Sequence, residues 1–260
     1  MRGDAMTDIH SHIVWGVDDG PPSIEESLAM LAAAADSGTT DIVATPHANP
    51  KYPFQRDLVI ERIQKLAEAA GVRPAIHFGC EFHLSFDNID HLMENLRQYT
   101  INGKQYLLVE CPDFHIGQHT EKVLQGMVDA GIVPIIAHPE RNPVLRRKLT
   151  RVEEWVELGC LLQVTAMSIT GGFGGSARTA SQRLLDQGLV HLIASDAHDP
   201  VNRHPRLAEA RQAVAARCGE DAAEILFAEN PRSVVEGAPL LGGKQIAWRR
   251  PARWYRFWSR

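Results

Sequence analysis

Residues 7–12 read Thr-Asp-Ile-His-Ser-His, a short strand-like run that ends in two histidines. Six more runs of strand length follow it, and longer segments with helical periodicity separate them. The seven predicted strands are residues 7–12, 41–47, 75–81, 105–110, 133–138, 160–165 and 189–196. Strands that alternate with helices predict an α/β fold with a parallel sheet. The simplest form is a closed (β/α)7 barrel, and an open doubly wound sheet is the alternative.

Local signals mark where the helices begin and end. Two capping boxes, Ser23 with Glu26 and Thr150 with Glu153, predict helix starts. Glycines that precede the next strand predict helix ends, and they are Gly38, Gly71, Gly131, Gly159 and Gly188. Asn102-Gly103 predicts a hairpin turn that leads into the fourth strand. The glycine-rich residues 171–175 lack the Lys-Ser/Thr of a nucleotide-binding loop, so we expect them to form a mobile flap.

The composition excludes several functional classes. The chain has 260 residues, of which 44% are hydrophobic and 23% charged, as in soluble globular proteins. Its net charge of −5 disfavours nucleic-acid binding. The amino-terminal residues lack the apolar stretch of a signal peptide, and no segment approaches a membrane span. The four cysteines form no Cys-x-x-Cys pair, and none has an arginine six residues downstream, as a cysteine-dependent phosphatase would require. We expect reduced thiols and a cytoplasmic location.

Metal-binding residue types lie at or just after six of the seven strand ends. They are His10, His12, Asp18, His47, Glu81, Glu110, His138, Asp196 and His198. Parallel strands bring such ends to one face, and a His-x-His pair on a strand points both rings to the same side. Each residue alone has a plainer explanation as a hydrogen-bonded histidine or a helix-entry carboxylate, and Asp18-Asp19-Gly20 is also a good turn sequence. The recurrence at six ends favours a metal centre.

Five histidines and four carboxylates provide enough ligands for two or three divalent ions. Nitrogen and oxygen ligands without thiolate favour manganese, with iron or zinc as alternatives. Three such ions would carry more positive charge than four carboxylates neutralise, which suits a phosphate dianion. Arg141 and Arg203 follow the fifth and seventh strands, where a guanidinium can bind phosphate oxygens in pairs, although either arginine could simply be solvated.

Three segments together resemble the polymerase-and-histidinol-phosphatase (PHP) superfamily. They are Asp8-Ile9-His10-Ser11-His12-Ile13 with Val17-Asp18-Asp19-Gly20-Pro21, Ala137-His138-Pro139-Glu140-Arg141, and Ile193-Ala194-Ser195-Asp196-Ala197-His198. Within it, the chain is similar to the bacterial protein-tyrosine phosphatases of capsular and exopolysaccharide biosynthesis, the CpsB/CapC-like group. The likeness extends from about residue 6 to residue 236.

The resemblance implies a distorted (β/α)7 barrel, the PHP fold, over residues 6–237. It also implies a trinuclear metal centre with the nine ligands named above, and phosphate-contacting roles for Arg141 and Arg203. The implied partner is the phosphotyrosine-bearing tail of a bacterial tyrosine kinase that governs polysaccharide polymerisation and export.

We expect hydrolysis of phosphotyrosine by a metal-bridging hydroxide, with no covalent enzyme intermediate. His83, two residues after Glu81, is a candidate general acid. One alternative is a small-molecule phosphatase of the same superfamily, such as one for histidinol phosphate. A second alternative is a metal-binding module without turnover.

Residues 238–260 form a basic, tryptophan-rich tail outside the resemblance. Arginine interleaved with tryptophan suits the inner face of a membrane. Packing between subunits of a homo-oligomer and a tail without fixed structure remain equal alternatives.

Overall fold

The computed structural model describes residues 5–71, 74–85, 89, 92–117 and 119–240. All of its paired strands are parallel, in two sheets. The first sheet has the order β1-β2-β4, with β1 at Met6–Ser11, β2 at Thr39–Ala44 and β4 at Ala75–Phe78. The second has the order β3-β5-β6-β7-β8-β9. Its strands are β3 (His47–Ala48), β5 (Glu81–His83), β6 (Tyr106–Glu110), β7 (Val133–Ala137), β8 (Leu161–Thr165) and β9 (Leu192–Ala194).

The second and third predicted strands are each divided between the two sheets. β2 ends at Ala44 and β3 begins at His47, while β4 ends at Phe78 and β5 begins at Glu81. Pro46, which has no N–H to donate to a ladder, lies in the first break, and its carbonyl accepts from the Glu81 N–H at 3.0 Å. As a result, His47 and Glu81 begin short strands of their own and pair in register.

One bridge, between Ser11 and Ala197, joins the first sheet to the segment that follows β9. Beside it, the His12 N–H donates to the Ala197 carbonyl and the Asp196 N–H donates to the His10 carbonyl, both at 2.8 Å. The fold is therefore mixed α/β with two parallel sheets. The predicted distorted seven-stranded barrel is not confirmed: no closed barrel is seen among the described residues, because the breaks in the second and third strands divide the hydrogen bonding.

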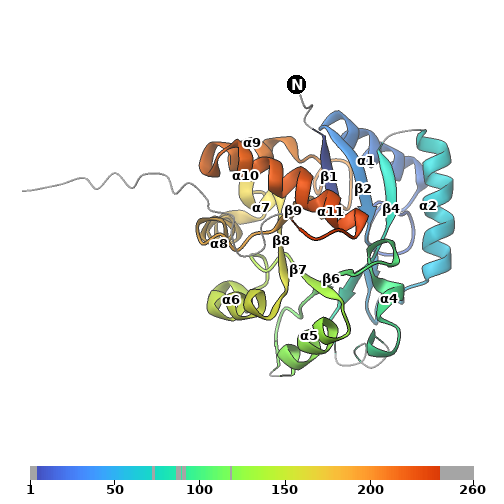
Figure 1. The fold of residues 1–260 in the computed structure, drawn as a ribbon. Coiled ribbons are helices and arrows are strands. Elements are labelled where there is room, and N and C mark those ends of the chain that lie inside the picture. The colour runs from blue at the N-terminus through green and yellow to red at the C-terminus, as the bar shows by residue number, and fades with distance from the viewer. Residues whose placement is uncertain (1–4, 72–73, 86–88, 90–91, 118, 241–260) are drawn as a thin grey trace, which may run out of the picture.

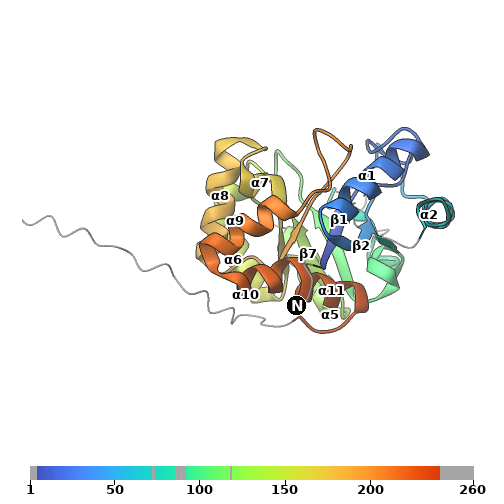
Figure 2. The ribbon, with the colours of Figure 1, turned by 90° about the horizontal axis from the view of Figure 1, so that it is seen from above.

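The helices lie around the outside of the strands (Figure 1). They are α1 (Ile24–Asp36), α2 (Arg56–Ala70), α4 (Leu96–Tyr99), α5 (Thr120–Asp129), α6 (Leu149–Leu158), α7 (Ala166–Thr170), α8 (Gly174–Asp186), α9 (Ala208–Cys218), α10 (Glu220–Glu224) and α11 (Asn230–Glu236). Two 3₁₀ turns lie at η1 (Ile101–Gly103) and η2 (Leu145–Arg147), and a short π-helix lies at η3 (Ile225–Glu229). The loop between β9 and α9 projects on the side opposite α11 (Figure 2).

Helix ends follow the sequence signals in part. Ser23 caps α1 as predicted, because its side chain accepts from the Glu26 N–H at 3.4 Å. The second capping box is wrong: η2 runs to Arg147, so α6 already begins at Leu149 and Thr150 lies inside it. The Asn102-Gly103 turn forms with φ of 52° and 69°, but β6 after it pairs in parallel, so no hairpin results.

The glycine-rich segment is not a flap. α7 ends at Thr170 and α8 begins at Gly174, so only residues 171–173 connect the two helices. Gly171 has a φ of 101° and ends α7 in a left-handed conformation, which glycine adopts without strain. The segment is therefore a tight helix–helix turn, and it carries the side chain of Phe173.

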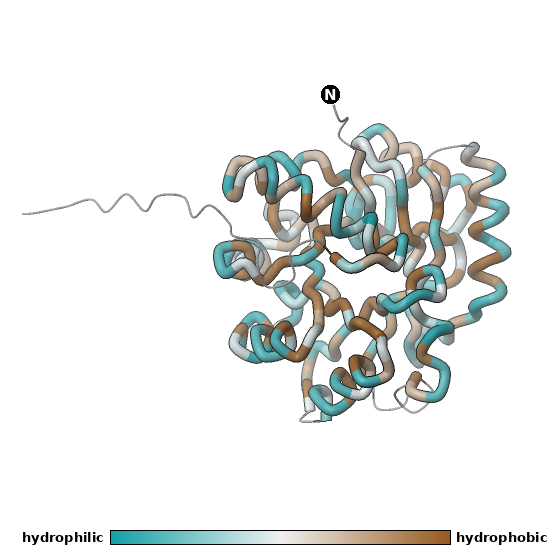
Figure 3. The backbone as a smooth tube through the Cα atoms, viewed as in Figure 1, coloured by the Kyte–Doolittle hydropathy of each residue, from teal (hydrophilic) through white to brown (hydrophobic). Residues whose placement is uncertain are grey.

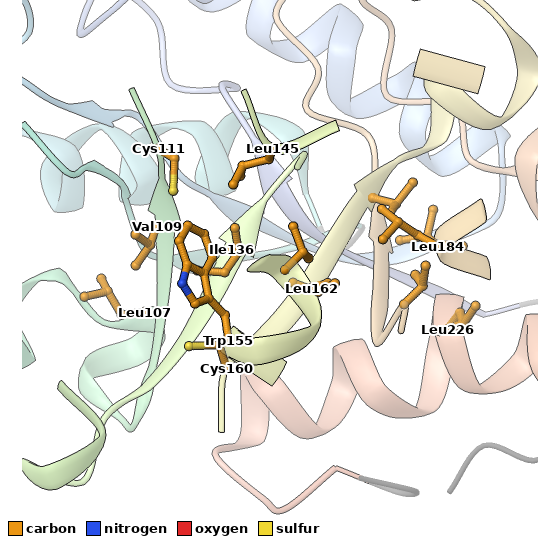
Figure 4. Close-up of a cluster of buried hydrophobic side chains, with 14 of the residues drawn as sticks. Leu107, Val109, Cys111, Ile136, Leu145, Trp155, Cys160, Leu162, Leu184 and Leu226 are labelled. Atoms are coloured by element: carbon orange, nitrogen blue, oxygen red, sulfur yellow. The ribbon is translucent and has the colours of Figure 1, made fainter. Parts of the chain in front are cut away.

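The largest hydrophobic core packs the second sheet against its helices. Trp155 of α6 is 1% exposed and lies among Val109, Ile136 and Leu162 (Figure 4). Burial of each such aliphatic side chain contributes about 1.5–3 kcal/mol. In Figure 3 the strands are largely hydrophobic, while α2 alternates between hydrophobic and hydrophilic residues. No helix in the described part of the chain is both long enough and apolar enough to cross a bilayer.

Candidate metal centre

The predicted ligands converge at one place. Four groups of side chains each place one ligand atom per residue within 4.8 Å of the others. The groups are His10, Glu81 and His138; His10, His12 and Asp196; His47, Glu81 and Glu110; and His12, Asp19, His47 and His198. Eight of the nine predicted ligands belong to them, and Asp19 is added. Shared members make the four groups one continuous cluster.

Backbone geometry at the strand ends places these side chains. His10 and His12 lie two residues apart on and just after β1, and their Nε2 atoms are 3.4 Å apart. His138 and Asp196, which follow β7 and β9, have positive φ values of 31° and 52°. Non-glycine residues rarely adopt such φ values, and each costs about 1–3 kcal/mol. The fold therefore maintains strain at two of the predicted ligand positions.

Hydrogen bonds fix which ring nitrogen faces the cluster. His10 Nδ1 lies 3.0 Å from Gln163 Oε1, and His198 Nδ1 lies 3.0 Å from the Asp196 carbonyl. Gln163 is fully buried on β8. With Nδ1 engaged as a donor, Nε2 of each ring is available to a metal ion. The sequence did not indicate Gln163, because a glutamine on a buried strand has no distinctive spacing.

Asp18, which the sequence predicts as a ligand, lies outside the four groups of described residues. Its Oδ2 lies 2.7 Å from His12 Nδ1 and accepts from the His47 N–H at 3.0 Å. Its Oδ1 accepts from the Gly20 N–H at 2.9 Å. Both oxygens are thus used to hold the turn and to orient His12.

Asp19 occupies the position that was expected for Asp18. Its Oδ1 lies 3.4 Å from Nε2 of both His47 and His198, and these contacts lower the pKa of the carboxyl. In an Asp-Asp pair, the sequence alone does not tell which carboxylate faces the site, because the turn decides it.

The electrostatics of the cluster fit divalent cations. Glu81 and Asp196 are 1% and 2% exposed, and Glu110 lies beside them. Burial and the charges of Glu81 and Asp196 raise the pKa of Glu110 to about 8. Burial lowers the pKa of His47, but hydrogen bonds with Asp19 and Glu81 raise it to about 9 overall. Bound protons thus partly neutralise the negative charge of the buried carboxylates. Divalent ions held by the nitrogen and oxygen donors would neutralise that charge more completely.

The cysteines do not contribute to the site. All four are free thiols, and Cys80, Cys111 and Cys160 are buried. Cys111 and Cys160 lie in the core around Trp155 (Figure 4). Burial raises the pKa of the Cys160 thiol to about 12, so it is no thiolate nucleophile at neutral pH.

Arg141 and Arg203, which the sequence predicts at the rim of one face, both contact Asp196. Arg203 Nη2 lies 2.7 Å from Asp196 Oδ2, and Arg141 Nη1 contacts the same oxygen. The Phe173 ring lies 4.2 Å from the Arg141 guanidinium carbon and 5.8 Å from that of Arg203. Arg203 Nε is buried without a hydrogen-bond partner among the described residues, so it has an N–H to offer a ligand oxygen.

His83 lies at the end of β5, where its Cα pairs with that of Glu110. It belongs to none of the four groups of described residues. Burial lowers the pKa of His83, which favours the neutral imidazole. This protonation state disfavours its predicted role as a general acid.

The chain is similar to known proteins over most of its length. Residues 6–236 match the family described as capsular polysaccharide synthesis, CpsB/CapC. CapC of Staphylococcus aureus is 37% identical over 202 residues, which cover 76% of this chain and 79% of CapC. The tyrosine-protein phosphatase CpsB of Streptococcus pneumoniae is 32% identical over 239 residues, which cover 88% of this chain and 98% of CpsB.

A solved structure shares the fold at high similarity. It belongs to a study of YwqE from Bacillus subtilis and CpsB from Streptococcus pneumoniae, described as unique metal-dependent tyrosine phosphatases. It superposes with a TM-score of 0.84 at 28% identity, covering 91% of this chain and 96% of that chain. Since the family match covers residues 6–236 of 260, the chain belongs to the CpsB/CapC family of capsular polysaccharide synthesis.

Proposed function

We propose that this chain is a metal-dependent protein-tyrosine phosphatase, with residues 6–237 as its catalytic domain. The observation that carries the proposal is the convergence of five histidines and four carboxylates beside two arginines that share Asp196. Relatives named as tyrosine-protein phosphatases support the choice of substrate.

The donor sets would hold two or three divalent transition ions. When bound, such ions supply positive charge for the phosphoryl oxygens and make a water nucleophile available near neutral pH. We expect manganese, with iron or zinc as alternatives, since imidazole and carboxylate donors suit all three.

The protein's own residues bind and orient the phosphate. The Arg141 and Arg203 guanidiniums face the same carboxylate oxygen, so their remaining N–H groups can bind the non-bridging oxygens of a phosphoryl group at the cluster. Asp18 and Gln163 hold the imidazoles of His12 and His10. A phenolate leaving group, with a pKa near ~10, departs without strong help from an acid, which fits a neutral His83.

Chelation tests the proposal directly. We expect EDTA to abolish hydrolysis of a phosphotyrosine peptide and Mn²⁺ to restore it, while metal analysis of the purified protein finds two or three ions per chain. Full activity after rigorous chelation would overturn the mechanism.

The two alternatives from the sequence make different predictions. A small-molecule phosphatase would show a higher kcat/KM on histidinol phosphate than on a phosphotyrosine peptide. A binding module would keep its ions and show no metal-dependent hydrolysis of any aryl phosphate.

The partner and the location extend the same proposal. We infer that the substrate is the phosphotyrosine tail of a bacterial tyrosine kinase of capsule synthesis, reached in the cytoplasm at the inner face of the membrane. The proposed membrane contact, and the alternative of packing in a homo-oligomer, depend on residues 238–260, of which 241–260 lie outside the described residues. Liposome co-sedimentation with and without residues 243–260 tests the membrane contact, which equal pelleting would exclude.

A further inference from the structure

A groove of about 670 Å³ lies between η2 and α8. Its polar lining consists of Arg146 and Arg147 from η2 with Ser176, Thr179 and Arg183 from α8. We call these five residues, together with Gly175 at the start of α8, the arginine groove. None of its lining residues carries a carboxylate.

The positive charge of the groove is not compensated within the described part of the chain. Two arginines elsewhere on the surface do have carboxylate partners: Arg151 pairs with Glu121 and Arg217 with Asp186, both at 2.7 Å. Among the described residues, no ion pair or hydrogen bond engages the side chains of Arg146, Arg147 and Arg183. Three unpaired guanidiniums around one groove create a site for an anion.

The start of α8 adds to this field. The helix is 13 residues long, and no side chain caps its first turn. The free N–H groups of a helix start, together with the helix dipole, attract anions. Gly175 lines the groove within this first turn, so the backbone N–H groups and the three arginines both attract an anion to the groove.

The groove adjoins the metal centre. Gly175 follows Phe173 by two residues, so their Cα atoms are at most about 7 Å apart. Phe173 packs on the Arg141 guanidinium at 4.2 Å, and Arg141 contacts Asp196 of the cluster. On the other wall, Arg146 follows Arg141 by five residues, and its N–H donates to the Asn142 carbonyl at 3.1 Å. An extended peptide that is bound at the arginine groove can therefore also reach the metal cluster.

We propose that the arginine groove binds a second anionic group of the protein substrate, a carboxylate or phosphate a few residues from the phosphotyrosine that is cleaved. The inference rests on the proposed phosphatase function and adds a substrate class to it: acidic or multiply phosphorylated peptides. Guanidinium groups bind both kinds of anion through paired hydrogen bonds, and the Ser176 and Thr179 hydroxyls can donate further ones.

The test compares two peptides with one phosphotyrosine each, flanked either by aspartate and glutamate or by serine and glycine. The metal-loaded full chain should hydrolyse the acidic peptide with a kcat/KM about tenfold higher at low salt, mainly through KM. In the triple variant R146Q/R147Q/R183Q this ratio should fall to about one. Arg147→Gln alone should lower the ratio roughly two- to fivefold, as expected for one exposed charge pair.

Arg232→Gln is the control matched to Arg147→Gln, because it removes one exposed arginine from α11, a helix that packs on η3 and β1. It should leave the ratio unchanged. A structural defect in the triple variant would lower kcat/KM for both peptides and keep their ratio, which would overturn the proposal. An unchanged ratio with normal activity would overturn it too.

A binding measurement separates this proposal from the phosphatase function. Fluorescence anisotropy of a labelled acidic peptide should show weaker binding to the triple variant than to Arg232→Gln, whether or not turnover occurs. Failure of the phosphatase function would instead appear as absent hydrolysis of both peptides by the wild-type chain. If the triple variant lost only binding to anionic vesicles and kept peptide binding, the groove would be a membrane site and the proposal would be wrong.

Discussion

Asparagine substitutions at Asp18 and Asp19 test two different proposed roles. Asp19 is the proposed metal ligand, and Asp18 is the residue proposed to orient the ligand His12. The two carboxylates are adjacent in the chain but differ in their contacts. Asp19 is the single carboxylate in a group with three histidines, whereas Asp18 lies behind His12 at 2.7 Å from its Nδ1. Asp18→Asn retains the shape of the side chain but removes the charge that accepts from the ring.

The size of each effect follows from these contacts. A hydrogen bond to a charged group contributes about 1.5–3 kcal/mol, which corresponds to roughly 10–100-fold in affinity. Loss of a residue that orients a metal ligand typically weakens metal binding by the same ~10–100-fold. We therefore expect Asp18→Asn to bind the wild-type number of ions, one of them about 10–100-fold more weakly. Asp19→Asn leaves that group with three imidazoles, so its ion should be lost at Mn²⁺ concentrations that saturate the wild type.

Mn²⁺ titration by calorimetry, together with metal analysis after gel filtration, measures both quantities. Thermal unfolding of the metal-free variants checks that each chain still folds. The reasoning would be refuted if Asp18→Asn released an ion while Asp19→Asn retained the full number, because Asp18 would then be the ligand.

Three further predictions concern other residues. The pKa of His191 is lowered to about 4 by burial, below the unfolded value near 6.5, so the unfolded chain binds more protons and stability falls as pH drops from 6.5 to 4. The loss in the free energy of unfolding reaches about 2 kcal/mol at pH 5. Asparagine in His191→Asn can still accept from the Leu162 N–H, so this variant should reduce the difference in the free energy of urea unfolding between pH 7.5 and 5 by about that amount. An unchanged difference would contradict this. Arg203→Lys removes a planar donor that touches Asp196 and should lower kcat/KM for a phosphotyrosine peptide by roughly 10²-fold, and a change within twofold would exclude a phosphate contact. Phe173→Leu removes ring contacts with two guanidiniums and should lower the same kcat/KM about three- to tenfold, whereas Phe173→Tyr should retain it.

Short-range patterns in the sequence predicted most of the residues that the structure brings together. Ligand-type residues at successive strand ends predicted a common face, since parallel strands place their carboxyl ends together. His10 and His12 illustrate the limit of the method: their spacing predicted a shared ion, but their hydrogen-bond partners Asp18 and Gln163 come from a turn and from a distant strand. Partners of this kind depend on tertiary packing, which has no local signature.

The errors in the predicted fold have the same origin. Residues 41–47 and 75–81 each have the pattern of one strand, but each is interrupted where the chain passes between sheets. Pro46 was the available signal for the first interruption, because it cannot donate to a ladder. For Thr150 the capping pattern was present, but a preceding helical turn had already set the start of α6. At Thr150 the neighbouring turn therefore overrode the local pattern, whereas the break at Pro46 follows from the residue itself.

The interruptions also explain how nine donors reach one small volume. An unbroken ladder through residues 41–47 and 75–81 would keep the regular spacing of neighbouring strands at every strand end. Starting new strands at His47 and Glu81 lets the two residues pair in register, so that His47 Nδ1 lies 3.0 Å from Glu81 Oε2. Positive φ at His138 and Asp196 redirects two further strand ends into the cluster. Asp196 then links the cluster to both arginines, and hence to Phe173 and the arginine groove. The irregular strands are therefore what brings a set of parallel strand ends together into the proposed site for metal ions and phosphate.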